Sequence, residues 1–167
     1  GVFTQVGANF PTQLWISARY LEAISLLGGF LFLKFELKSY KKLVASYSLF
    51  TVIILLAIFS GLFPDCFLPG SGLTLFKVVS EYIIIALVLI SILIVKFNND
   101  FTNQTTYRYL IASMLTTICS ELLFTFYIEV YGLSNILGHF LKLLSFYFIY
   151  KAINEISLKA PYKTLFY

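Results

Sequence analysis

Hydrophobic residues along the chain fall into five long runs, separated by short polar or turn-forming segments. An α-helix needs roughly 20 residues to cross a hydrocarbon core of about 30 Å, and it satisfies its backbone polar groups internally. The pattern therefore predicts an all-α, polytopic transmembrane helical bundle with five spans. The predicted spans are Thr12–Phe35, Leu43–Phe63, Leu73–Phe97, Thr106–Tyr131 and Ser134–Leu158.

Residues that begin or end helices lie between these runs. Pro11 suits the first position of a helix, where a backbone N–H would be unpaired anyway. Pro64 is predicted to close the second span, and the segment Pro64–Leu73 is dense in turn formers. The polar segment Asn98–Thr105 ends the third span, and a short turn at Val130–Asn135 joins the last two.

Composition places the chain in a membrane. Hydrophobic residues make up 59% and charged residues 12% of the sequence, and the mean hydropathy is +0.88. Soluble domains have roughly 45–50% apolar and about 25% charged residues. The lipid bilayer is therefore the expected partner. The formal charge of +4 does not indicate nucleic acid, because lysines of membrane proteins collect on cytoplasmic loops.

Nine of the twelve Lys and Arg residues lie near the connections or ends of the spans, and they share one side of the membrane if the chain alternates. The opposite side, made of the first eleven residues, the Pro64–Gly72 loop and the turn at Tyr131, contains no Lys or Arg. The positive-inside rule then predicts a multi-pass plasma-membrane protein with Gly1 outside and the C-terminus in the cytoplasm. The basic residues concerned are Lys34, Lys38, Lys41, Lys42, Lys96, Arg108, Lys151, Lys159 and Lys163.

Seven further ionisable residues form a candidate layer inside the predicted spans. At a rise of 1.5 Å per residue they fall roughly 6–15 Å below the outer boundary, so four helices contribute to one layer. Residues three or four positions apart share a helix face, and the layer contains three such pairs. Its members are Arg19, Glu22, Lys77, Glu81, Glu121, His139 and Lys142.

Two interpretations of this layer stay open. The charges form interhelical salt bridges with nothing bound, or they line a polar pocket in the outer half that binds a small ligand. Three aromatic residues near the layer, Trp15, Tyr82 and Tyr127, could form pocket walls. They equally fit the aromatic belt at a membrane interface, which is the better interpretation for Trp15.

The sequence contains no catalytic constellation. Neither a P-loop, nor HExxH, nor GxSxG occurs, so this segment is not expected to be an enzyme. His139 is the one histidine. It suits a structural hydrogen bond, a pH switch or one haem ligand. Because these roles differ, His139 does not identify a cofactor, and the cofactor is unknown. Cys66 and Cys119 should lie at different depths, which argues against a disulfide.

Three long runs resemble a known family, the third of the membrane-associated sensor (MASE) domain families. They are NFPTQLWISARYLEAISLL, FPDCFLPGSGLTLFKVVSEYII and SELLFTFYIEVYGLSNILGHFLKLLSFYFIYKAI. The resemblance implies a sensory input domain over residues 1–160 and, over 161–167, the start of a linker to a cytoplasmic histidine kinase or diguanylate cyclase in the same chain. It also implies a homodimer, and two further helices before Gly1 in a bundle of about seven.

The resulting hypothesis is a sensor of a small ligand. Binding would change the pairing of Glu121 with Arg19, Lys77 or Lys142, switch the packing of the last two helices and displace the last one. A transporter or channel fragment, with the same charges lining a path, is the alternative, although the inner halves of the spans are almost wholly apolar. A structural domain without a ligand is the third interpretation.

Overall fold

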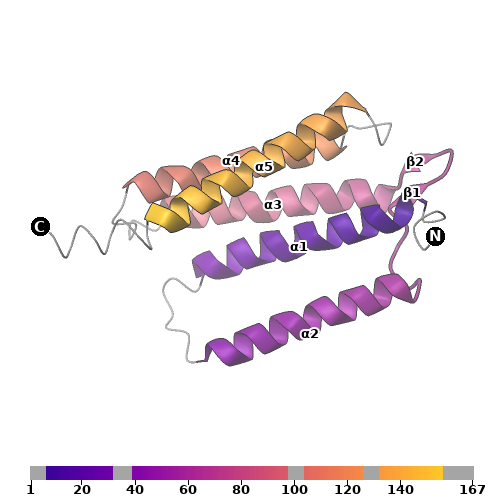
Figure 1. Cartoon of the computed structure of the whole chain (residues 1–167), viewed down its shortest axis with the longest axis horizontal. Helices are drawn as coiled ribbons and strands as arrows, with labels where there is room; N and C mark the ends of the chain where they lie inside the picture. Colours follow the sequence, from indigo (N-terminus) through magenta and orange to yellow (C-terminus); the bar gives the residue numbers. More distant parts are fainter. Residues whose placement is uncertain (1–6, 32–38, 98–103, 126–131, 156–167) are drawn as a thin grey trace, which may run out of the picture. The chain divides into compact units, whose positions relative to one another are not determined.

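The computed structural model describes residues 7–31, 39–97, 104–125 and 132–155. These residues form five helices and one antiparallel hairpin (Figure 1), which confirms the predicted all-α class. The helices are α1 (Asn9–Leu31), α2 (Tyr40–Phe59), α3 (Leu75–Phe97), α4 (Gln104–Thr125) and α5 (Leu133–Asn154), and the strands are β1 (Phe67–Leu68) and β2 (Gly72–Leu73). The chain divides into two compact units, Gly1–Leu87 and Val88–Tyr167, which are described separately.

Four of the helices in the described ranges, α1, α2, α3 and α5, are long and apolar enough to cross a membrane. With 22 residues, α4 has a similar length, but it contains many hydroxyl side chains together with Arg108 and Glu121. Because of these polar residues, α4 is not among the helices that are apolar enough to cross a membrane. The fifth span stays a prediction for α4.

Burial along the helices is inverted relative to a soluble protein. On α3 the buried positions form one stripe with spacings of three and four residues, and that stripe contains Lys77, Ser80, Glu81 and Ser91. Large apolar side chains such as Leu75, Leu93 and Phe97 are exposed. Apolar side chains facing outward and polar side chains facing inward match a lipid solvent.

The end of α2 corrects the predicted span, which ran to Phe63. The helix ends at Phe59 because Gly61 has a φ of +73°, in the left-handed region that glycine adopts without strain. The N–H of Leu62 donates to the carbonyl of Ala57 at 2.9 Å, and that of Gly61 donates to Ile58 at 3.2 Å. This Schellman pair closes the helix four residues earlier than predicted.

All five helix starts differ from the predicted ones, by one to three residues. Three residues before the predicted Thr12, α1 begins at Asn9, so Pro11 lies within its first turn rather than at its first position. Because the Thr74 hydroxyl accepts from the Lys77 N–H at 3.3 Å as a helix cap, α3 starts at Leu75. The predicted ends at Phe35, Tyr131 and Leu158 lie outside the described residues.

A small hairpin occupies the predicted Pro64–Leu73 loop. Its turn places Pro69 and Gly70 at the central positions, with Gly70 at φ +85° and the Ser71 N–H donating to Leu68 at 3.1 Å. Proline followed by a glycine of positive φ is the arrangement of a type II turn. The loop thus has a defined conformation.

Side chains of α1 hold the hairpin within the first unit. The Asn9 Oδ1 accepts from the N–H groups of Cys66 and Phe67 at 2.7 and 3.0 Å, and its Nδ2 donates to Asp65 at 2.7 Å. The Gln13 amide donates to the carbonyls of Phe63 and Pro64 at 3.1 and 3.0 Å. Backbone groups that no regular element satisfies are paired in this way.

Both cysteines are free thiols. Cys66 lies in the hairpin with 0% of its surface exposed. Burial raises the pKa of its thiol from 9.0 to about 12, against the smaller opposing effect of the Lys77 ammonium. Its Sγ donates to the Pro64 carbonyl at 3.7 Å.

We expect Cys66 to resist thiol-specific reagents in the folded protein. Because only the thiolate attacks, raising the pKa from 9.0 to about 12 lowers the reactive fraction at pH 8 by about a thousandfold. The measurement is the rate of maleimide labelling of a Cys119→Ala variant between pH 7 and pH 10, folded and denatured. Equal rates in the two states would contradict the prediction.

Candidate functional site

Six of the seven ionisable residues predicted within the membrane form ion pairs within a unit. In the first unit, Arg19 Nη1 lies 2.6 Å from Glu22 Oε2, one turn further along α1. The Arg19 guanidinium also lies 4.6 Å from the centroid of the half-buried Trp15 ring, within cation–π range. The predicted pairing of Arg19 with Glu22 on one helix face is confirmed.

The second pair of this unit is more deeply buried. Lys77 Nζ lies 2.9 Å from Glu81 Oε1 on α3, and these side chains are 1% and 0% exposed. Tyr82, predicted as a wall residue, is 49% exposed. It therefore does not share the buried stripe of Lys77 and Glu81.

In the second unit the ion pair joins two helices. Lys142 Nζ of α5 lies 3.5 Å from Glu121 Oε1 of α4, with 3% and 0% of the side chains exposed. Lys142 Nζ also lies 5.4 Å from the Phe146 ring centroid. Removing two charges from water is costly, and breaking such a pair leaves an uncompensated buried charge. The Glu121–Lys142 pair is thus the ionic element whose change would most affect α4 and α5.

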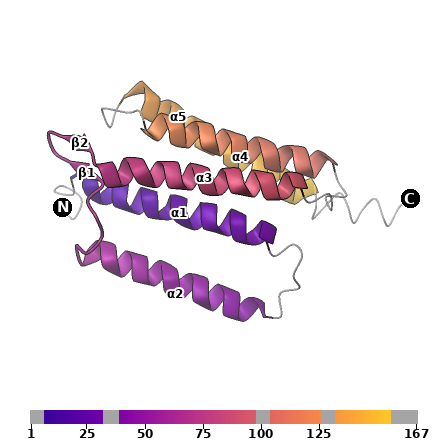
Figure 2. The ribbon, with the colours of Figure 1, turned by 180° about the vertical axis from the view of Figure 1, so that it is seen from behind.

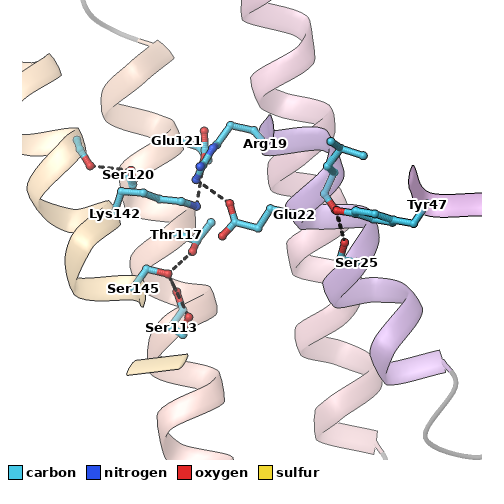
Figure 3. Close-up of polar contacts among 12 residues, drawn as sticks. Arg19, Glu22, Ser25, Tyr47, Ser113, Thr117, Ser120, Glu121, Lys142 and Ser145 are labelled. Atoms are coloured by element: carbon cyan, nitrogen blue, oxygen red, sulfur yellow. Dashed lines mark hydrogen bonds and ion pairs between the residues drawn. The ribbon is translucent and has the colours of Figure 1, made fainter. Parts of the chain in front are cut away.

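Hydroxyl groups bind α4 to α5 beside this pair (Figure 3). The Ser145 Oγ lies 2.6 Å from Thr117 Oγ1 and 3.1 Å from Ser113 Oγ, and it donates to the Ser113 carbonyl at 3.1 Å. The Ser120 hydroxyl donates to the Gly138 carbonyl at 2.8 Å. All four hydroxyl side chains are buried.

An aromatic contact lies one turn after Ser120 on the same face of α4. The Phe124 ring covers Gly138 so closely that a Cβ there would lie 2.7 Å from Phe124 Cε1. His139 packs edge-on against Phe124 with centroids 5.1 Å apart, and His139 is exposed. His139 therefore lies at the border of the α4–α5 contact, while Lys142 lies inside it.

Sequence reasoning found the charges of this site and missed its uncharged parts. The structure brings Glu121 and Lys142 together, whereas Tyr127 lies outside the described residues. The hydroxyl groups and Gly138 were not predicted, although small residues recur every seven positions in both helices. Among the described residues, no group of three or more His, Cys, Asp or Glu side chains could hold a metal ion.

Comparison with known proteins identifies a family for the chain. No curated protein and no solved structure matches the chain. The family of membrane-associated sensor domains known as MASE3 matches residues 1–161. The chain belongs to the MASE3 family of membrane-associated sensor domains.

Proposed function

We propose that this sensor domain is the input of a signal-transduction protein and responds to a small ligand at its buried ionised groups. The Glu121–Lys142 pair carries the proposal, because it joins two helices at 3.5 Å and is almost fully buried. Binding would change the charge partners of Glu121. The change would be relayed through α5, whose last turn contains Lys151.

The resemblance to sensor domains of kinases and cyclases suggests the rest of the pathway. We propose a cytoplasmic histidine kinase or diguanylate cyclase in the same chain, a homodimer, and residues 161–167 as the start of the linker. Basic residues at the ends of α3 and α5, Lys96 and Lys151, support a multi-pass orientation in the plasma membrane with a cytoplasmic C-terminus.

The remaining ionised groups, Arg19, Glu22, Lys77 and Glu81, are proposed as further ligand contacts in the outer half of the membrane. Each pair is internally balanced. A ligand that exchanges one partner therefore alters the charge balance of a water-poor region, where electrostatic interactions are strongest. A transport path is the alternative, and polar lining on the inner turns of the spans would favour it.

The test is the Glu121→Gln variant of the full-length parent in lipid vesicles. Native mass spectrometry of the wild type identifies a small molecule that co-purifies, and effector output is measured in parallel. We expect Glu121→Gln to lower occupancy and to change output at least tenfold. Asp65→Asn is the matched control, because it also converts a carboxylate to an amide but at an exposed position. Wild-type occupancy and output in Glu121→Gln would refute the proposal.

A further inference from the structure

Small buried residues recur at intervals of seven along both helices of the second unit. On α4 they are Thr106, Ser113 and Ser120, and on α5 they are Gly138, Ser145 and Ala152, all buried. Both ribbon views draw α4 and α5 side by side (Figures 1 and 2). A strict seven-residue repeat keeps one seam of each helix facing its partner.

Two layers of this seam are fixed by hydrogen bonds between the helices. Ser120 donates to the Gly138 carbonyl at 2.8 Å. Ser113 Oγ lies 3.1 Å from Ser145 Oγ, and Ser145 donates to the Ser113 carbonyl at 3.1 Å. The second layer lies seven residues before the first on α4 and seven residues after it on α5, so one antiparallel register satisfies both.

The third layer differs chemically. The same register places Thr106 opposite Ala152, which has no hydrogen-bonding side chain. Within the described ranges, Thr106 Oγ1 is buried and has no hydrogen-bond partner. The seam is thus hydrogen-bonded in its first two layers, beside the Glu121–Lys142 pair. Its third layer, near the C-terminal end of α5, contains no such bond.

We propose that this seam fixes the register of α4 and α5 independently of the Glu121–Lys142 pairing, so that a signal leaves as movement of the helix pair rather than as sliding of α5 along α4. The inference deepens the proposed function, on which its signalling consequence rests. Two of the seam bonds end on backbone carbonyls, those of Ser113 and Gly138. These acceptors keep their charge and position when an ionic partner changes.

Geometry makes sliding costly. A slip of α5 by one turn, about 5.4 Å, would remove both hydroxyl layers and move the Phe124 ring from Gly138 onto a residue with a side chain. Each buried hydroxyl left without a partner costs about 1–3 kcal/mol. Small residues also allow the close approach that a membrane helix pair needs.

The experiment measures the α4–α5 register directly. Spin labels are placed at Leu115 and Ile153, which are 50% and 55% exposed, in a Cys119→Ala background of the full-length protein in vesicles. Double electron–electron resonance spectroscopy measures the distance between the two spin labels in the wild type, in Glu121→Gln and in Ser145→Val. We expect Glu121→Gln to leave the distance within about 2 Å of wild type, and Ser145→Val to shift or broaden it, because a slip moves a label by about 5.4 Å per turn.

Either a shifted distance in Glu121→Gln or an unchanged, narrow distribution in Ser145→Val would overturn the inference. Effector output of the same samples tests the proposed function separately. An unchanged effector output in Glu121→Gln would contradict the proposed role of Glu121 in signalling. The distance between the spin labels would still test the register of α4 and α5. Should Ser145→Val not fold, Ser120→Ala, which removes the interhelical bond to the Gly138 carbonyl, takes its place with the same expected broadening.

Discussion

Replacing Glu121 by leucine is expected to lower the free energy of unfolding by about 3–5 kcal/mol, because the substitution removes the carboxylate that pairs with a buried ammonium. Lys142 is 3% exposed and its Nζ lies 3.5 Å from the Glu121 carboxylate. No other substitution proposed here should destabilise the protein as strongly. Reversible unfolding of the protein in mixed detergent micelles, followed by circular dichroism, measures the change.

The double variant Glu121→Leu with Lys142→Leu is the control. Replacing both partners of a buried ion pair by apolar residues is often neutral or stabilising, so the double variant should regain most of the lost stability. A double variant whose loss equals the sum of the two single losses would show that the two charges act independently. That result would remove the pair from the account of the site.

The general architecture was predictable because lipid imposes a simple rule on sequence. Continuous apolar runs must become helices when no water is present to satisfy the backbone, and the five helices follow the five runs. The end of α2 was not predictable from hydrophobicity. Leu62 and Phe63 continue the apolar run, but the left-handed conformation of Gly61 ends the helix before them.

The candidate site was predictable where it depended on charge. Arg19 with Glu22 and Lys77 with Glu81 meet because they lie three or four residues apart on one helix. The position of His139 was less accessible, because depth along a helix does not reveal which face a residue occupies. Its neighbour Gly138 is buried against the Phe124 ring, while His139 is exposed.

The second large loss of stability is expected at Gly138. Substituting alanine there should destabilise the α4–α5 pair by about 1–3 kcal/mol through overpacking. The added Cβ would lie 2.7 and 2.8 Å from two atoms of the Phe124 ring, and that ring is only 2% exposed. In a helix free of such contacts, alanine is about 1 kcal/mol more favourable than glycine. The unfolding measurement used for Glu121 also applies here.

Two comparisons separate the clash from helix propensity. Gly29→Ala in α1 is the matched control, since nothing lies within 4 Å of its added Cβ, and it should be neutral or slightly stabilising. In a Phe124→Leu background the ring is gone, so Gly138→Ala should change from destabilising to neutral or favourable. The coupling energy of this double-mutant cycle is expected to be about 1–3 kcal/mol. If the Phe124→Leu background leaves the Gly138→Ala loss unchanged, the ring does not set the distance between α4 and α5, because removing it would then have relieved nothing.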